Sequence, residues 1–436
     1  MSRHSPDARK GILTRRQCFA LPWAAWPGLQ ALAQAPAAGS PQDGRLVLVF
    51  LRGAIDGLSV FAPHADPRYR SLRGSTAIPA PDGSAQTALA LDAHFGLHPA
   101  LAPLWPLWQR GQLAFVPCAG LPQAVRSHFE AQHLWESGLT ASRASSGWLN
   151  RWAGALGRPA EPVALGVGES NPEVLRGPAP VQRVPRGKAA LASGASSRDR
   201  VQQALQDLYA DDRELGPLLG RGLRQREQTT RTLRDAEATG MDATSAEQRA
   251  ANNGAAAVAG LALDARHLAT LMQHDPRLRI GFLSAGGWDT HANQGGVQGQ
   301  LANGLGQLAR ALLELQAAFA RPNDLIVVAS EFGRTAAENG TRGTDHGHGN
   351  ALWVLGPRVQ GGRWHGRWEG LAQGQLNEGR DLPVFHDYRA VMSLLLQRTQ
   401  GAGDAQLAAL FPDGPFAGTP LLAGDNRLLA GLLRPA

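Results

Sequence analysis

The chain has 436 residues, of which 43% are hydrophobic and 18% are charged, so it holds enough apolar sequence to bury a globular core. Its formal net charge is +7, but no dense basic run with interleaved aromatic residues occurs, so we do not expect a nucleic-acid partner. The chain has 2 cysteines, and Cys18 lies in a segment that we expect to be removed, which leaves Cys118 without a disulfide partner and excludes a cysteine-based metal site.

Residues 1–35 have the composition of an export signal. A basic start leads to Arg15 and Arg16, a broken apolar stretch follows, and the small-x-small motif AQA at residues 33–35 provides a cleavage site near Ala35. The paired arginines resemble a twin-arginine signal, which would make that export machinery a partner and place the mature protein in the periplasm or outside the cell. The apolar stretch is shorter than the ~20 residues that cross a bilayer, and no later segment is long enough, so no membrane span is expected in the mature chain.

Several short runs rich in apolar and β-branched residues predict buried strands. They are Arg45–Leu51, Leu113–Pro117, Pro162–Val167, Arg279–Ser284, Asp324–Ala329 and Ala351–Leu355. Between them, Ala255–Met272 and Leu301–Phe319 have the pattern of helices, the second with leucines at three- and four-residue spacing. The alternation of strands and helices predicts an α/β fold with a layered sheet.

Residues 186–255 differ in composition from the rest of the chain. They are rich in Ala, Arg, Gln, Asp and Glu and poor in large apolar residues. We interpret them as a helical insertion, which is either a lid over a site or a solvated pair of surface helices without a functional role.

Side chains suited to catalysis or metal binding follow four of the predicted strands. In open α/β sheets the binding site forms beyond the carboxyl ends of the strands, so these segments are expected to converge. They are Arg52–Gly57, Arg126–His128, Gly286–His291 and Glu331–Thr335, and a further loop, Thr344–Gly349, precedes the last predicted strand. Any one of them could have a purely structural role, and their common position is what predicts a site.

Two of these segments have the pattern of metal ligands. Asp345, His346 and His348 lie within four residues on a loop whose glycines let the backbone bend until the side chains converge. Asp289 and His291 alternate along the chain, so in an extended segment they share a face. Imidazole nitrogen together with carboxylate oxygen suits zinc or manganese, with magnesium or calcium as alternatives. For each segment the competing interpretation is a solvated turn.

The motifs GGWDTH, ASEFGRT and TDHGHG, preceded by LRGAIDGL and RSHFEAQ, resemble the bacterial family called "domain of unknown function 1501". The resemblance extends from about Leu46 to Leu396. It implies a branch of the alkaline phosphatase/sulfatase-like superfamily, whose fold would be a three-layer α/β/α sandwich with a mostly parallel central sheet over residues 44–436, here with the helical insertion. It also implies an exported hydrolase of phosphate or sulfate esters with two divalent metal ions.

The superfamily pattern further implies which residues bind those metals. By their place in the motifs they are Asp56, Ser127, Asp289, His291, Asp345, His346 and His348. Ser127 would lie between the metals as the nucleophile, and Asp56 would be the acid after the first strand. The alternative for Ser127 is to cap the helix that is expected to follow it.

The same pattern divides the ligands between the two metals. Asp289, His291 and His348 would serve one metal. Asp345 and His346 would serve the other. The spacing departs from the superfamily, because one residue separates Asp289 from His291 and because His348 comes early in the chain, so this division stays open.

Five further residues are expected near the substrate. Arg52, Arg126 and Arg334 each lie within a few residues of a proposed ligand and could hold the non-reacting oxygens of an anionic ester in a bidentate way, unless they form ordinary ion pairs. His128 would contact substrate, support a ligand or substitute for one. Glu331 would ligate metal, orient a ligand or act as a base.

Two other functions fit the same residues. The first is a non-catalytic, metal-containing binding protein of the same fold. The second is a metal-dependent hydrolase of another bond, with Glu331 as the general base and no covalent intermediate. In the leading hypothesis the substrate is an anionic small-molecule or polymer ester.

Overall fold

The computed structural model describes residues 43–140, 145–157, 161–168, 172–191, 196–210, 212–237, 258, 260–414 and 424–435. The predicted export signal, residues 1–35, therefore lies outside the described residues. Within the described part of the chain, none of the helices combines the length and the apolar character that crossing a membrane requires.

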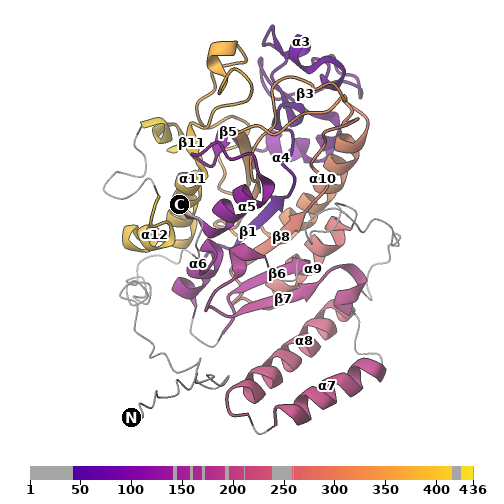
Figure 1. The fold of residues 1–436 in the computed structure, drawn as a ribbon, viewed down its shortest axis with the longest axis vertical. Helices are drawn as coiled ribbons and strands as arrows, with labels where there is room; N and C mark the ends of the chain where they lie inside the picture. The colour runs from indigo at the N-terminus through magenta and orange to yellow at the C-terminus, as the bar shows by residue number, and fades with distance from the viewer. Residues whose placement is uncertain are drawn as a thin grey trace, which may run out of the picture.

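A sheet of eight strands, counted over the described residues, forms the centre of the molecule (Figure 1). Its spatial order is β11-β5-β10-β9-β1-β8-β6-β7. The strands are β1 (Leu46–Leu51), β5 (Leu113–Gly120), β6 (Ala164–Gly168), β7 (Val181–Pro185), β8 (Ile280–Ala285), β9 (Leu325–Ser330), β10 (Asn350–Leu355) and β11 (His386–Asp387). Only β10 runs antiparallel to its neighbours, β5 and β9, so the structure confirms an α/β fold with a mostly parallel sheet.

All the strands that the sequence predicted are present, but the sequence missed the shortest ones. β11 has two residues, and β2 (Phe61–Ala62), β3 (Leu89–Ala90) and β4 (Gly96–Leu97) form a separate small sheet with two residues each. Segments of this length are too short to show a periodic pattern. β7 was missed for another reason, because it lies at the edge of the large sheet and its sequence, VQRVP, has two adjacent polar residues and no apolar run.

Helices cover both faces of the large sheet. The α-helices are α2 (Gly57–Val60), α3 (Tyr69–Arg73), α4 (Trp105–Gln109), α5 (His128–Ser137), α6 (Trp148–Leu156), α7 (Ser196–Leu208), α8 (Leu215–Glu237), α9 (Leu261–His274), α10 (Gln300–Ala318), α11 (Tyr388–Gln400) and α12 (Asp404–Leu410). The 3-10 helices are η2 (Gly74–Thr76), η3 (Pro99–Leu104), η4 (Glu173–Leu175), η5 (Gly187–Leu191), η6 (Gln373–Gln375) and η7 (Gly424–Leu429).

The two faces of the sheet are packed into separate apolar clusters. Val47 and Val49 of β1 belong to one cluster, together with buried residues of α9 and α10. Leu48 and Phe50 belong to the other, together with α5, α6 and α11. This division follows from the alternation of side chains along a strand, and it explains why β1 is apolar at every position.

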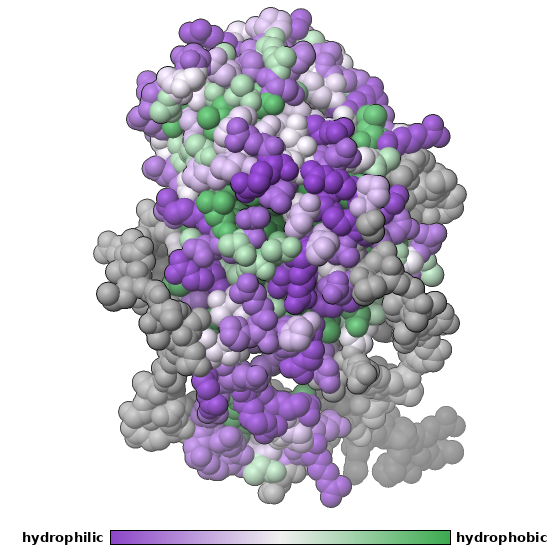
Figure 2. Space-filling model, turned by 180° about the vertical axis from the view of Figure 1, so that it is seen from behind, coloured by the Kyte–Doolittle hydropathy of each residue, from purple (hydrophilic) through white to green (hydrophobic). Residues whose placement is uncertain are grey.

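The described part of the predicted insertion is helical. It consists of η5, α7 and α8, and Figure 1 shows α7 and α8 as a hairpin that projects below β7. Its base is fixed by polar contacts, since Gln182 Nε2 donates to Thr229 Oγ1 at 2.8 Å and Arg186 Nε donates to Asp264 Oδ2 at 2.7 Å. Figure 2 shows the opposite face of the molecule, where the lower part is mainly hydrophilic.

The middle strands of the sheet end at the same level. Leu51 of β1 is paired with Ala285 of β8 on one side and with Ser330 of β9 on the other. Because the three strands are parallel, the segments that follow them leave the sheet side by side. The polar residues that the sequence places after these strands therefore start from one edge.

Candidate metal centre

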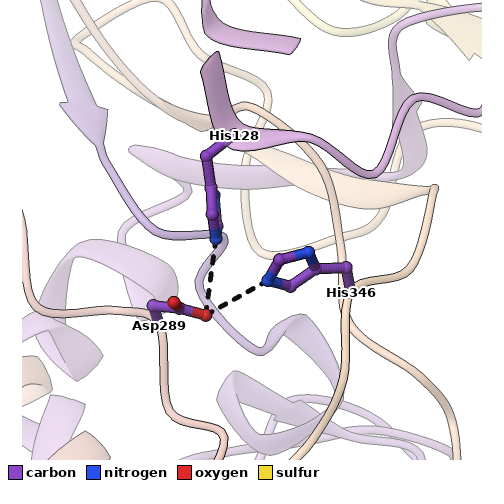
Figure 3. Close-up of side chains that lie close together, drawn as sticks. All are labelled: His128, Asp289 and His346. Carbon is purple, nitrogen blue, oxygen red and sulfur yellow. Dashed lines mark hydrogen bonds and ion pairs between the residues drawn. The ribbon is translucent and has the colours of Figure 1, made fainter. Parts of the chain in front are cut away.

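Four side chains from three separate loops meet at this edge of the sheet. His128 is the first residue of α5, Asp289 and His291 follow β8, and His346 lies in the loop before β10. Asp289 Oδ1 is 3.4 Å from His128 Nε2, 3.0 Å from His291 Nε2 and 3.3 Å from His346 Nε2. Figure 3 shows His128 and His346 directed at this carboxylate. The Nε2 atoms of His291 and His346 are 2.9 Å apart.

Each of the three imidazoles has an oxygen acceptor opposite its other ring nitrogen. The pairs are His128 Nδ1 with Glu331 Oε1 at 2.9 Å, His291 Nδ1 with Asp345 Oδ1 at 3.0 Å, and His346 Nδ1 with the Arg126 carbonyl oxygen at 2.7 Å. An acceptor at that position requires the hydrogen to be on Nδ1. In a neutral ring the Nε2 atom then carries the lone pair, which is the arrangement found behind histidines that bind metals.

The centre consequently gathers acceptor atoms, and the donor beside them is the Arg334 guanidinium, which contacts Asp289 Oδ1 and lies 3.5 Å from His291 Nε2. His128, Asp289 and His346 each offer a ligand atom within 4.8 Å of the others, and the contacts of His291 add a fourth. With metal–ligand bonds of about 2.1 Å, ligand atoms lie about 3.0 Å apart at a right angle and about 3.4 Å apart at a tetrahedral angle. The distances from Asp289 Oδ1 to the three imidazoles, and the distance between His291 and His346, match such edges. His128, Asp289 and His346 therefore fit one divalent cation, with His291 beside them.

The electrostatics of the centre favour positive charge at its middle. Burial lowers the pKa of His128, but the hydrogen bonds and the negative charges of Asp289 and Glu331 outweigh burial and raise the pKa to about 9. Burial likewise raises the pKa of Asp289, yet its contacts with His128, His346 and Arg334 hold that pKa far below its usual range. The same negative groups that retain a proton here would stabilise a metal ion, and the two compete.

Glu331 is completely buried behind His128. Its Oε1 atom accepts hydrogen bonds from the Gly53 backbone at 2.8 Å, from Gln132 Nε2 at 2.9 Å and from His128, while Oε2 accepts one from Ser330 Oγ at 3.0 Å. Burial raises its pKa, but these hydrogen bonds prevail and lower it, so the carboxylate stays charged. Of the roles that the sequence allows, this geometry fits the orientation of a ligand.

Asp345 lies behind His291 rather than beside His346. Its Oδ1 atom accepts from His291 Nδ1 and, at 3.0 Å, from Asn339 Nδ2. The bond from Asn339 is the main cause of the lowered pKa of Asp345. Half of the side chain (52%) is exposed, so Asp345 orients His291 from the solvent side of the centre.

Arg334 is buried and holds the loops of the centre together. Its guanidinium donates to the backbone oxygens of Gly53, Ala54, Trp288 and Thr344 and to the carboxylate of Asp289. These partners belong to three different loops. Only 2% of Arg334 is exposed. In this geometry Arg334 joins the loops of the centre, and it does not hold the oxygens of a substrate as the sequence predicted.

The other two predicted arginines are also paired within the protein. Arg52 is buried, and its guanidinium contacts Glu136 Oε1 and Gln132 Oε1, each at 2.7 Å. Arg126 is partly exposed and pairs with Glu378 at 2.7 Å and Asp381 at 3.1 Å. Arg126 contributes to the centre through its backbone, because its carbonyl oxygen orients His346.

Ser127 directly precedes His128 and caps helix α5. Its hydroxyl is exposed and accepts a long hydrogen bond, 3.5 Å, from the backbone nitrogen of Glu130. This is the alternative that the sequence left open for Ser127. The capping interaction is weak at this length, so it holds the hydroxyl only loosely.

Two predicted ligands point away from the centre. His348 is buried, and its Nε2 atom lies 2.8 Å from the carbonyl oxygen of Leu121. Burial lowers its pKa, so the ring is held neutral. Asp56 is buried in an ion pair with Arg73 and also accepts from Gln294 at 2.6 Å. The described structure therefore brings together Asp289, His291 and His346 from the predicted ligands and adds His128 to them.

Several residues around the centre were not anticipated. They are Arg73, Gln132, Gln294 and Asn339. Each touches a predicted site residue from a different segment of the chain. Gln132 ends the motif RSHFEAQ, but polar residues of these types are common in every loop and helix, and no sequence pattern marks the other three.

One family model matches the chain over residues 43–410, and its description is "Protein of unknown function (DUF1501)". The match spans the whole large sheet and every residue of the centre. No curated protein matches the chain.

Proposed function

The chain belongs to the DUF1501 family, whose description names no activity, and we propose that it is an exported, alkaline-phosphatase-like, metal-dependent hydrolase of phosphate or sulfate esters. One observation carries this proposal: three imidazole Nε2 atoms lie within 3.4 Å of one carboxylate oxygen, Asp289 Oδ1, and the Nε2 atoms of His291 and His346 are 2.9 Å apart. Nitrogen and oxygen lone pairs held this close repel one another unless a proton or a cation lies between them.

The donor set favours zinc or manganese over magnesium or calcium. Three imidazoles and one carboxylate are ligands of borderline softness, whereas magnesium and calcium prefer oxygen alone. A divalent metal bound there would supply a Lewis acid that neutralises charge on the oxygens of an ester. Within the chain, Glu331, Asp345 and the Arg126 carbonyl oxygen keep the three rings turned toward it.

Ser127 is the proposed nucleophile. Its exposed hydroxyl is next to the ligand His128 at the N-terminus of α5, where the positive end of the helix dipole favours developing negative charge. In the proposed reaction its oxygen forms a bond to phosphorus or sulfur while the bond to the departing alcohol breaks. Water then releases the acid and restores the hydroxyl.

A second candidate is the non-catalytic, metal-containing binding protein. It is favoured by the pairing of all three predicted substrate arginines with groups of the protein itself. In that case the cation would hold three loops together, as Arg334 does, and Ser127 would only cap α5.

Metal analysis and an esterase screen test these proposals together. The mature chain, loaded with zinc or manganese, is assayed on aryl phosphate monoesters, aryl phosphate diesters and aryl sulfates. We expect turnover of one class, its loss in Ser127→Ala with metal retained, and no effect of Ser71→Ala, an exposed serine whose hydroxyl bonds to the Arg68 carbonyl.

Each result of this experiment has a clear meaning. A chain that binds no divalent metal contradicts both candidates. A metal-loaded chain without turnover supports the binding protein, and wild-type turnover in Ser127→Ala shows that Ser127 is not the nucleophile.

A further inference from the structure

The superfamily pattern calls for two metals, and the chain departs from it at Asp56. We infer that the protein binds a single divalent cation, in the centre of His128, Asp289, His291 and His346, and that the guanidinium of Arg73 takes the place of a second cation beside Asp56. This inference rests on the proposed metal-dependent function and narrows the kind of centre that performs it.

Asp56 and Arg73 form a closed, neutral pair inside the protein. Only 1% of Asp56 and 0% of Arg73 are exposed. One guanidinium nitrogen of Arg73 contacts Asp56 Oδ2 and also donates to Ser59 Oγ at 2.7 Å. Ser59 Oγ and Gln294 Nε2 donate to the same carboxylate oxygen, at 2.8 Å and 2.6 Å. A metal ion at this oxygen would meet hydrogen-bond donors and a fixed positive charge, and both would repel it.

The remaining ligands that a second metal would need do not converge. His348 is turned to a backbone carbonyl, and Asp345 is used by His291 and Asn339. Among the described residues, one group of three or more potential ligand side chains is close enough to hold an ion, and it consists of His128, Asp289 and His346.

The neutral pair instead supports the loops that carry the ligands. Gln294 donates to Asp56 and accepts, through Oε1, from Thr290 Oγ1 at 2.7 Å and Thr344 Oγ1 at 3.0 Å. Thr290 lies between Asp289 and His291, and Thr344 precedes the Asp345–His346 pair. Asp56 and Arg73 thus act as positioning residues, which reach the loops of the centre through Gln294.

A second cation could bind Asp56 only through its other carboxylate oxygen, Oδ1. Asp56 Oδ1 is buried and has no hydrogen-bond partner among the described residues. A second cation would have to bind at this oxygen, whereas a buried water molecule would satisfy it equally well. The experiment is therefore aimed at Asp56.

The test counts metal ions and does not depend on activity. The mature chain is stripped with a chelator, dialysed against Zn²⁺ and, separately, Mn²⁺, and analysed for bound metal. We expect one equivalent for the wild type, one for Asp56→Asn with Arg73→Gln, and none for Asp289→Asn at the same free metal concentration. Asp275→Asn, which removes a carboxylate paired only with nearby Arg277, is the matched control and should retain one equivalent.

A second measurement uses the wild type alone, so it does not depend on how the double variant folds. Crystals soaked in Zn²⁺ should give one anomalous peak, between His128, Asp289 and His346, and none at Asp56. Two equivalents in the wild type, or a peak at Asp56, overturns the inference and leaves the proposed function standing. No bound metal at all contradicts the proposed function as well.

Discussion

Asp289 and Asp56 each follow a buried parallel strand at the same edge of the sheet, yet their surroundings are opposite. Asp289 is 40% exposed, and its Oδ1 atom faces three imidazole Nε2 atoms as well as the Arg334 guanidinium. Asp56 is buried, and a guanidinium, a hydroxyl and an amide all donate to it. Each carboxylate is paired with a buried arginine, but the first also faces three imidazoles, whereas the second meets only donors.

This difference shows that the position of an acid after a strand does not decide its role. A buried carboxylate that is paired with arginine and accepts several hydrogen bonds at one oxygen gains little from a metal at that oxygen. A carboxylate that shares its space with acceptors gains from any cation. The four predictions below test this contrast, starting with the largest expected effect.

Asp289→Asn should remove the cation from the centre. This carboxylate is the atom group that all three imidazoles share, so the loss in metal affinity should exceed the ~100-fold that the loss of an outer partner can cost. Titration against a competing chelator measures the affinity. Near-UV circular dichroism tests whether the variant keeps the tertiary structure of the wild type. Retained affinity in a folded variant would show that the centre does not bind metal through Asp289.

Arg73→Met should destabilise the fold because it leaves the charge of Asp56 buried without a partner. We expect a loss of about 3–5 kcal/mol in the free energy of unfolding. The matched control is Arg277→Met, which breaks the largely exposed pair with Asp275 and should cost about 0–1 kcal/mol. Urea unfolding of the metal-loaded chain measures both. Equal losses of stability for the two changes would show that the Asp56–Arg73 pair is no more shielded from solvent than the pair of Arg277 with Asp275.

Glu331→Gln should weaken metal binding about 10- to 100-fold, because an amide cannot accept from all of the donors that surround this carboxylate. Asp345→Asn should have a smaller effect, since half of that side chain is exposed and water can replace its bond to His291. The same chelator titration compares them. A larger loss for Asp345→Asn would mean that Asp345 binds the metal itself.

Phe129→Ser should have the smallest effect. Phe129 follows the ligand His128 on α5, but 69% of it is exposed. We expect metal affinity equal to that of the wild type and a change in unfolding free energy within about 0.5 kcal/mol. A clear loss of metal would show that the first turn of α5 needs this side chain to place His128.

Much of the fold could be predicted from the sequence. The strands of the sheet that are long enough to show an apolar run were found, because burial on both faces leaves little choice of residue. The common level of β1, β8 and β9 then explains why Asp289, His291 and Glu331 come together as expected. β7 and the strands of two residues carry no such signal.

The candidate site was predicted only in part, because the role of each side chain depends on partners from distant segments. His128 was expected to contact substrate, support a ligand or substitute for one, and the Glu331 carboxylate, 203 residues away in the chain, turns its Nε2 atom toward Asp289. Asp56 was expected to be a ligand, and Arg73 and Gln294, the latter 238 residues away, enclose it. Sequence spacing cannot report such pairings.

The sequence by itself determined the family, the α/β character and the strand-end loops that carry acids and histidines, because buried strands and metal-type residues leave local patterns. Only the three-dimensional fold shows which of these residues converge on one centre and which are enclosed by donors. That choice follows from which hydrogen-bond donors and acceptors the fold sets around each side chain, and those neighbours come from segments far apart in the chain.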